Sequence, residues 1–297
     1  MASSYVFCGG IFMANEHINW FPGHMKKTRE LIQDNLKLTN AAIEILDARI
    51  PVASKNPVID ELIKNKRRIV ILNKSDLSDP KANDAWVRYF KQNGAEPVCM
   101  NALTGDGMAD LFKVLNRLRD EINKDSPRKK PVRAMIVGIP NVGKSSLINR
   151  LAGKKSAKTG NKPGVTRGKQ WINLQDQIQL LDTPGILWPK FDDREVALRL
   201  SFAGSIKDEI LDREDLTIEL IKVLQETYPE LLRERYKLES VEGEPLEIME
   251  TICEKRGFLM SGKRYDYARA ARTIMDEFRG GKLGRISLEF PPERQKK

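Results

Sequence analysis

The chain has 297 residues, of which 40% are hydrophobic and 31% are charged, a balance that excludes a fully disordered chain and is typical of a globular protein. Its net charge of +10 and pI of about 9.4 favour a polyanionic partner such as nucleic acid, although many basic proteins have no such partner. Its three scattered cysteines form neither a disulfide framework nor a metal-binding spacing, and no apolar run is long enough to span a bilayer.

The first twelve residues are mildly apolar and carry no charge. They lack both the basic start of a signal peptide and the arginines of an organelle transit sequence. We therefore expect residues 1–12 to be a disordered or extraneous extension. The missing transit signal favours a bacterial cytoplasmic protein.

Strand and helix patterns alternate over the next two thirds of the chain. Strands are expected at residues 41–47, 68–72, 96–101, 132–137, 170–174 and 177–181. Helices are expected at residues 26–37, 58–65, 80–92 and 108–122, and from about residue 143. This alternation predicts an α/β domain over residues 13–204, with a mostly parallel sheet covered by helices on both faces.

The pattern changes beyond about residue 205, where strand-like runs nearly vanish. Helices are expected at residues 216–227, 245–255 and 267–278. We therefore predict a second, all-α domain over residues 205–297.

A glycine-rich stretch follows the strand expected at 132–137. Residues 138–145, Gly-Ile-Pro-Asn-Val-Gly-Lys-Ser, match the phosphate-loop pattern in its required strand-to-helix context. The backbone N–H groups of such a loop wrap phosphates, and the helix N-terminus adds its dipole. We expect Lys144 to reach the β- and γ-phosphates and Ser145 to bind Mg²⁺. The predicted phosphate-binding residues are Gly138, Asn141, Val142, Gly143, Lys144, Ser145, Ser146, Thr166 and Gly185.

Two further features complete the expected magnesium and γ-phosphate site. Asp182-Thr183-Pro184-Gly185 follows an apolar strand, where the carboxylate can hold Mg²⁺ through water and the Gly185 N–H can bind the γ-phosphate. Thr166 lies between this motif and the phosphate loop, where a switch threonine would close on Mg²⁺. Each feature alone is an ordinary turn or loop, but together they predict that Ser145, Thr166 and Asp182 hold Mg²⁺.

Asn73-Lys74-Ser75-Asp76 reads as a guanine-recognition motif at the end of a strand. A buried Asp76 can accept hydrogen bonds from guanine N1–H and N2–H₂, two donors that adenine lacks. The stem of Lys74 can lie along the base. Asn101-Ala102-Leu103 would supply an N–H to guanine O6, although this motif is weak because it begins with Asn instead of the usual Ser. The predicted guanine-binding residues are Asn73, Lys74, Asp76, Asn101 and Ala102.

The order of these motifs is reversed relative to an ordinary GTPase, because the base reader precedes the phosphate loop. Trp20-Phe21-Pro22-Gly23-His24-Met25 lies near the start, and Asp47-Ala48-Arg49 follows the first strand. With these motifs, the chain resembles the RbgA (YlqF) family of circularly permuted GTPases over about residues 19–290. The resemblance implies a circularly permuted P-loop GTPase domain, a C-terminal helical domain and a role in assembly of the large (50S) ribosomal subunit.

Ras-like enzymes carry a water-orienting glutamine at the position that Ile186 occupies here, and an isoleucine can neither donate nor accept a hydrogen bond. The resemblance implies that His24 is catalytic, and an imidazole could orient water or act as a base near neutral pH. A structural role for His24 in the N-terminal loop is the alternative. The resemblance also implies a K⁺ ion held in part by Asn141, which would add positive charge at the phosphates. A simple loop cap is the other interpretation of Asn141.

The C-terminal part of the chain is rich in Lys and Arg, with tyrosines that can stack on unpaired bases. A solvated basic face is the alternative to an RNA-binding face. The resemblance implies contact with 23S rRNA. The candidate RNA-binding residues are Lys263, Arg264, Tyr267, Arg269, Arg272, Arg279 and Lys282.

The leading functional hypothesis is a GTP-hydrolysing assembly factor that uses Mg²⁺ and K⁺ and is stimulated by the ribosomal subunit. The alternative is a nucleotide-gated RNA-binding assembly platform with little intrinsic hydrolysis. A membrane-anchored signalling GTPase is disfavoured, because the chain ends without a lipidation cysteine. The expected partners are GTP or GDP and the large ribosomal subunit with its 23S rRNA. No membrane partner is expected, and the chain is expected to be monomeric away from the ribosome.

Overall fold

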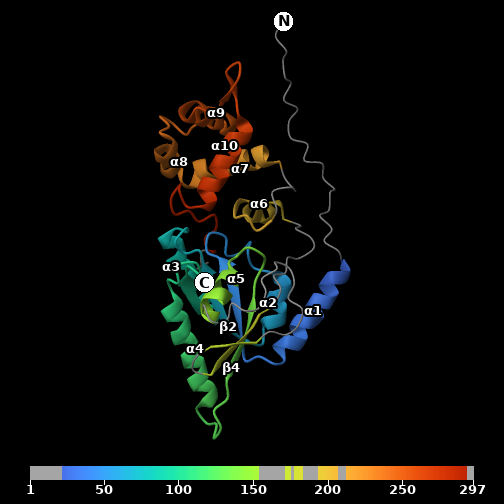
Figure 1. The fold of residues 1–297 in the computed structure, drawn as a ribbon. Coiled ribbons are helices and arrows are strands. Elements are labelled where there is room, and N and C mark those ends of the chain that lie inside the picture. Colours follow the sequence, from blue (N-terminus) through green and yellow to red (C-terminus); the bar gives the residue numbers. More distant parts are fainter. Residues whose placement is uncertain (1–21, 154–170, 175–176, 183–192, 207–211, 293–297) are drawn as a thin grey trace.

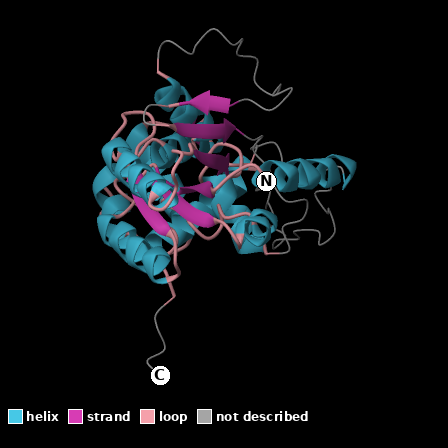
Figure 2. Ribbon diagram, turned by 90° about the horizontal axis from the view of Figure 1, so that it is seen from below, coloured by secondary structure: helices cyan, strands magenta, loops and turns pink. Residues whose placement is uncertain are grey.

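A computed structural model of the chain describes residues 22–153, 171–174, 177–182, 193–206 and 212–292. It shows an α/β part with a central sheet and a group of helices above one end of that sheet (Figure 1). Seen from below, helices lie on both sides of the strands (Figure 2). Within the described residues, no helix is both long and apolar enough to cross a membrane.

The central sheet has six strands in the order β3-β2-β1-β4-β6-β5, all parallel except β5, which runs antiparallel to β6. Its strands are β1 (Ala41–Asp47), β2 (Arg67–Asn73), β3 (Glu96–Met100), β4 (Val132–Val137), β5 (Trp171–Asn173) and β6 (Ile178–Asp182). The chain runs outward from β1 to β3, returns to β4 beside β1, and then continues in the opposite direction. The carboxyl ends of β1 and β4 therefore form the switch point, where open α/β sheets bind their ligands.

Alternate residues of β1 send side chains to opposite faces of the sheet, as the strand period requires. Ile43 and Ile45 belong to the core that contains the buried leucines of α4 (Met108–Asn123) and α5 (Lys144–Ala152). On the other face, Ala42 packs with α1 (Pro22–Leu36) and α2 (Pro57–Ile63), while Leu46 packs with α3 (Pro80–Gln92). Helices therefore cover both faces, and the predicted α/β architecture is confirmed.

The C-terminal part is helical, as the sequence predicts, with a small hairpin inserted. Its helices are α6 (Arg194–Phe202), α7 (Arg213–Thr227), α8 (Pro229–Tyr236), α9 (Pro245–Arg256) and α10 (Tyr267–Arg279), and its hairpin is formed by β7 (Leu259–Met260) and β8 (Arg264–Tyr265). The sequence patterns do not predict α6, α8 or the hairpin. Helix α6 lies before residue 204, yet it packs against α7 and α10.

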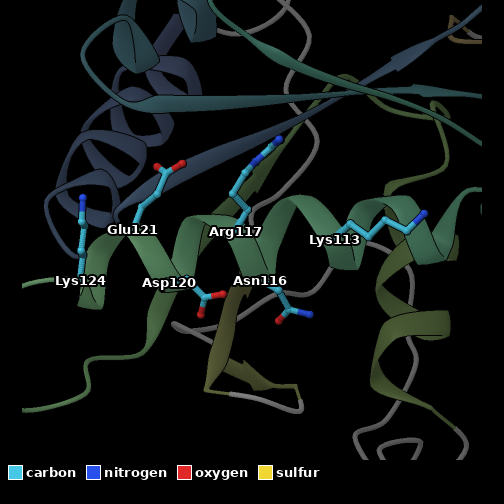
Figure 3. A pocket seen from close by; sticks show the side chains of 6 residues that line it. All are labelled: Lys113, Asn116, Arg117, Asp120, Glu121 and Lys124. Atoms are coloured by element: carbon cyan, nitrogen blue, oxygen red, sulfur yellow. The ribbon is translucent and has the colours of Figure 1, made fainter.

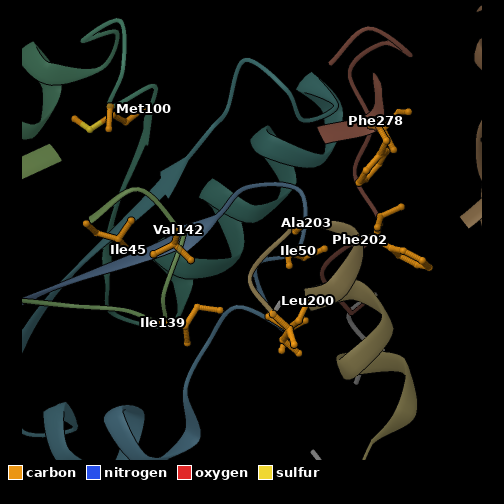
Figure 4. Close-up of a cluster of buried hydrophobic side chains, with 14 of the residues drawn as sticks. Ile45, Ile50, Met100, Ile139, Val142, Leu200, Phe202, Ala203 and Phe278 are labelled. Atoms are coloured by element: carbon orange, nitrogen blue, oxygen red, sulfur yellow. The ribbon is translucent and has the colours of Figure 1, made fainter. Parts of the chain in front are cut away.

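The hydrophobic core is continuous between the sheet and the helical part (Figure 4). Ile45 and Ile50 from the sheet side belong to the same buried cluster as Phe202 of α6 and Phe278 of α10. Burial of such a contiguous apolar surface is the main favourable term in folding and association. One buried apolar cluster therefore connects the sheet with the C-terminal helices.

Candidate nucleotide site at the carboxyl ends of the sheet

Four loops that carry the motifs named above lie where the parallel strands end. Asp47 ends β1 and Asn73 ends β2, while Asn101 follows β3 and Gly138 follows β4. These strands are adjacent in the sheet, so motifs that are far apart in the sequence lie side by side. The sheet topology thus places the predicted base-reading and phosphate-binding loops together at the carboxyl ends of the strands.

Asn73 links the base-reading loop to both of the other nucleotide motifs. Its buried side-chain amide donates to the Val142 carbonyl oxygen at 2.6 Å, and its side-chain oxygen accepts from the Ala102 N–H at 2.9 Å. Gly143 has a φ of 99°, and a Cβ atom there would lie 2.1 Å from the Asn73 amide nitrogen. Only glycine fits this close approach. Asn73 was predicted to bind guanine, but in the structure its side chain links the loop after β2 to the loop after β3 and to the phosphate loop.

The loop after β3 is held by its own side chain and by α5. The Asn101 side-chain oxygen accepts from the N–H groups of Leu103 at 2.8 Å and Thr104 at 3.1 Å, as an Asx-turn does. Arg150 of α5 donates from Nε to the Ala102 carbonyl oxygen at 3.0 Å. Because the Ala102 and Leu103 N–H groups already have acceptors, guanine O6 would have to share or replace one of these bonds.

Lys74 has a left-handed backbone conformation, with a φ of 60°. Its Nζ donates to Asp47 Oδ2 at 2.8 Å. Asp76 was expected to be buried, but its side chain is exposed. An exposed carboxylate next to a fixed loop can still accept from guanine N1–H and N2–H₂, and the base would then cover it.

The sequence patterns assign no role to the buried ion pair between Asp47 and Arg49. Arg49 donates from Nε at 3.0 Å and through a second guanidinium nitrogen at 2.8 Å, so the pair is bidentate. Burial alone would raise the pKa of Asp47, but Arg49 and Lys74 hold that pKa well below its ordinary value. The guanidinium of Arg49 also lies 5.4 Å from the ring centre of Phe278 in α10, which is within cation–π distance. The sequence contains Asp47 and Arg49 two residues apart, which was the only sign of this ion pair. That spacing does not predict the contact between Arg49 and Phe278 of α10.

The phosphate loop ends at the N-terminus of α5, as predicted. Gly143 is the N-cap, and Lys144 and Ser145 are the first two helical residues. Ser145 is exposed and Ser146 is half-buried. The N–H groups and the dipole of a helix N-terminus favour an anion. Asn141 has a φ of 62°, and its side-chain amide donates to the Gly204 carbonyl oxygen at 3.0 Å, which joins the phosphate loop to the turn after α6.

The predicted magnesium ligands are only partly within the described residues. Asp182 is the last residue of β6 and pairs in register with Ile136 of β4, beside the strand that leads into the phosphate loop. The described residues contain no cluster of three His, Cys, Asp or Glu side chains that could hold a metal. The hydroxyl of Ser145 and the strand-end position of Asp182 fit Mg²⁺ that is bound together with a nucleotide. Thr166, Gly185 and the His24 side chain lie outside the described residues, although His24 falls within α1.

An open hollow along α4 is separate from these motifs (Figure 3). Its six lining residues come from that helix and its C-cap and are Lys113, Asn116, Arg117, Asp120, Glu121 and Lys124. Several of them are engaged in surface ion pairs, such as Arg117 with Glu96 at 2.7 Å. All six lining residues are charged or polar, whereas small-molecule sites are lined mainly by hydrophobic and aromatic side chains.

The structure divides the predicted RNA-binding residues into two groups. The first group is exposed and consists of Lys263, Arg264, Arg269, Arg272 and Lys282. The second is engaged inside the chain: the Tyr267 hydroxyl bonds a Glu250 carboxylate oxygen at 2.5 Å, and Arg279 donates to the carbonyl oxygens of Phe202 at 3.0 Å and Ser201 at 2.7 Å. Arg279 thus binds the C-terminal end of α6, where a cation is favoured.

A doubly wound sheet, a glycine-rich loop at a helix N-terminus and a base-reading loop braced against it define a P-loop GTPase. The connections give that GTPase a permuted order, because β1 to β3 and their base-reading loops precede β4 and the phosphate loop.

Comparison with known proteins agrees with this class. Residues 133–251 match a family described as 50S ribosome-binding GTPase. The chain is 46% identical to ribosome biogenesis GTPase A of Bacillus cereus over 93% of this chain and 95% of that protein. It is 32% identical to ribosome biogenesis GTPase A of Thermotoga maritima over 93% and 95% of the two chains. The structure of GNP-bound YlqF from T. maritima superimposes with a TM-score of 0.61 at 30% identity, covering 90% of this chain and all of that one.

The chain therefore belongs to the ribosome biogenesis GTPase A (RbgA/YlqF) family and is a GTPase of that family. The resemblance that the sequence motifs indicate is confirmed. A P-loop GTPase of this kind binds its nucleotide together with Mg²⁺.

Proposed function

We propose that this protein binds and hydrolyses GTP while it assembles the large ribosomal subunit. The observation that carries the proposal is the double hydrogen bond of Asn73, which joins the base-reading loop, the Asn101 loop and the phosphate loop into one nucleotide site. Within it we assign guanine recognition to Asp76 and phosphate binding to the 138–146 segment. Residues 13–204 carry the nucleotide site, and residues 205–297 carry the RNA contact.

Our proposal for hydrolysis combines His24 with cations, since Ile186 cannot orient water. His24 orients or deprotonates the attacking water, for which an imidazole is suited near neutral pH. Mg²⁺, held by Ser145, Thr166 and Asp182, neutralises phosphate charge. Asn141 is suited to help hold K⁺, because its amide nitrogen is occupied by the Gly204 carbonyl oxygen and its side-chain oxygen therefore points elsewhere.

GTP turnover with purified large ribosomal subunits tests this arrangement. Turnover is expected to rise with subunits in potassium buffer and to rise much less in sodium buffer. His24→Ala is expected to lower the stimulated rate by roughly 10²–10⁴-fold, the range for loss of a positioned acid–base group. The chain has one other histidine, so His17→Ala is the matched control and should leave the rate unchanged.

Two outcomes would contradict the hydrolysis proposal. A His24→Ala rate equal to wild type would make His24 structural. Slow GTP turnover that neither ribosomal subunits nor potassium increase would favour a nucleotide-gated binding platform. The isoleucine at position 186, which cannot orient water, is consistent with that alternative.

For the RNA contact we propose the exposed basic side chains around the hairpin and α10. Lys263 and Arg264 lie at the hairpin, and Arg269 and Arg272 lie on the exposed face of α10. Such side chains neutralise phosphates and release counterions. We leave Arg279 out, because its guanidinium donates to carbonyl groups of α6. The bacterial relatives point to a cytoplasmic ribosome as the site of action.

A further inference from the structure

After α10 the chain returns to the α/β part and lies along its base-reading loop. We call residues 285–289 the C-terminal strap. The Ile286 N–H donates to the Leu77 carbonyl oxygen at 2.9 Å, and the Leu288 N–H donates to the Arg49 carbonyl oxygen at 2.8 Å. The strap thus forms backbone hydrogen bonds with the loops that follow both β2 and β1.

Arg285 reaches into the guanine-recognition motif itself. Its Nε donates to the Ser78 carbonyl oxygen and its terminal nitrogen to the Ser75 carbonyl oxygen, both at 2.9 Å. Ser75 stands between Lys74 and Asp76. A planar guanidinium that bridges two carbonyl groups fixes their relative position in a way that a single ammonium does not.

Two other strap residues, Ser287 and Glu289, hold the rest of the strap against the α/β part. The Ser287 hydroxyl accepts from the Asp79 N–H at 3.1 Å. The buried Glu289 carboxylate accepts from the Ala53 N–H at 3.0 Å, and the Glu289 carbonyl oxygen accepts from the Trp86 indole N–H at 3.1 Å. Buried polar groups satisfied in this way hold one conformation, because losing a partner leaves a costly unpaired group.

The base-reading loop is therefore held from two sides. On one side Lys74 bonds the buried Asp47 carboxylate, and on the other side the strap bonds the backbone of residues 75–79. Asp76 itself is exposed and lies between these fixed points. We propose that Arg285 is a positioning residue for guanine recognition, so that the C-terminal helical part sets how well Asp76 reads the base. This inference rests on the proposed guanine-binding role of Asp76.

The coupling must act in both directions, because linkage between two equilibria is reciprocal. A guanine that engages Asp76 stabilises the loop backbone that Arg285 holds, and so stabilises the strap. A phosphate group that contacts only the phosphate loop reaches this backbone indirectly, through the side chain of Asn73, and is expected to have a smaller effect. The base is therefore the part of the nucleotide that acts most directly on the strap.

The test compares affinities for GDP and for inosine diphosphate, which lacks the N2 amino group that Asp76 is proposed to bind. Arg285→Ala is expected to reduce the preference for GDP by about fivefold to tenfold, the scale of one impaired hydrogen bond to a charged group. Affinity for inorganic pyrophosphate should be unchanged. Arg117→Ala, which removes an exposed arginine of α4, is the control and should keep the full preference.

A second variant separates this inference from the assignment of the guanine site. Asp76→Asn should abolish the preference for GDP. If it does not, the guanine assignment itself fails. If Asp76→Asn abolishes the preference while Arg285→Ala keeps it, the base site stands and the positioning role of Arg285 is overturned.

Amide hydrogen exchange of the wild-type protein gives a readout that does not depend on a variant folding. Exchange of the Ile286 and Leu288 N–H groups is expected to slow more with saturating GDP than with saturating pyrophosphate. Equal protection by both ligands, or by neither, would contradict a base-specific link to the strap.

Discussion

Asn73→Ala is expected to weaken GDP and GTP binding by roughly a hundredfold. The substitution leaves the Val142 carbonyl oxygen and the Ala102 N–H without their partner, and each unsatisfied buried group costs about 1–3 kcal/mol. The expected loss falls on both base and phosphate recognition, because Asn73 joins the loops that bind them. Titration with a fluorescent GDP analogue measures the effect.

The matched control for this prediction is Asn65→Ala, which removes an exposed asparagine in the turn before β2. It should leave the affinity within about twofold of wild type, as surface substitutions usually do. An Asn73→Ala protein that binds GDP as tightly as the control would show that the loops are held together by other contacts.

Arg49→Met is expected to lower the free energy of unfolding by about 3–5 kcal/mol, the usual cost of removing one partner from a buried ion pair. Both side chains of the pair are almost fully buried, at 1% and 0% exposure. The variant also loses the contact between Arg49 and the Phe278 ring of α10. Chemical denaturation followed by circular dichroism measures the change.

Arg117→Ala provides the comparison, because it removes an ion pair with Glu96 that is about half exposed on both sides. Exposed pairs contribute about 0–1 kcal/mol, so this variant should be close to wild type. The double variant Asp47→Asn/Arg49→Met should be more stable than Arg49→Met alone, since it no longer buries a poorly paired carboxylate. A double variant that is less stable than Arg49→Met would contradict the account.

The same ion pair predicts a pH dependence with a definite sign. Because Arg49 and Lys74 hold the pKa of Asp47 below its ordinary value of 3.8, the unfolded chain takes up this proton first on acidification. The stabilising contribution is therefore complete above that value and is lost as the pH falls below it. The stability difference between wild type and Arg49→Met should shrink in this acidic range.

The sequence predicts the α/β part well, because its strands are apolar runs and its loops carry defined chemistry. Residues 69–72 of β2 are all buried, and a buried parallel strand reads as such a run. The phosphate loop has glycines and a lysine at fixed spacing, and the base-reading motif has a lysine and a carboxylate at fixed spacing. Each motif directly follows a predicted strand, so the sequence also predicts its position at a strand end.

The sequence predicts the helical part less completely. Helix α6 buries Leu200, Ser201 and Phe202 at its C-terminal end, which leaves no repeating apolar face to recognise. Each strand of the β7–β8 hairpin has only two residues, and both residues of β7 are exposed. Pattern-based prediction needs longer periodic segments than these.

The contacts between segments that are distant in the sequence could not be predicted from the sequence motifs. Arg285 donates to backbone carbonyl groups of Ser75 and Ser78, and any residue type provides a carbonyl oxygen. Arg279 shows the same difficulty, because its spacing from Arg269 and Arg272 suggests one common face, yet the structure directs it to the end of α6. The link between the nucleotide loops and the helical part becomes visible only in the folded chain.

The central claim is that this GTPase acts on the large ribosomal subunit through its helical part. The most direct measurement is co-sedimentation with purified large subunits in the presence of a non-hydrolysable GTP analogue. The wild-type chain should pellet with the subunits, while a variant with Arg264, Arg269 and Arg272 replaced by alanine should stay in the supernatant and still bind GTP. A wild-type chain that does not pellet, or a variant that pellets equally well, would contradict the claim.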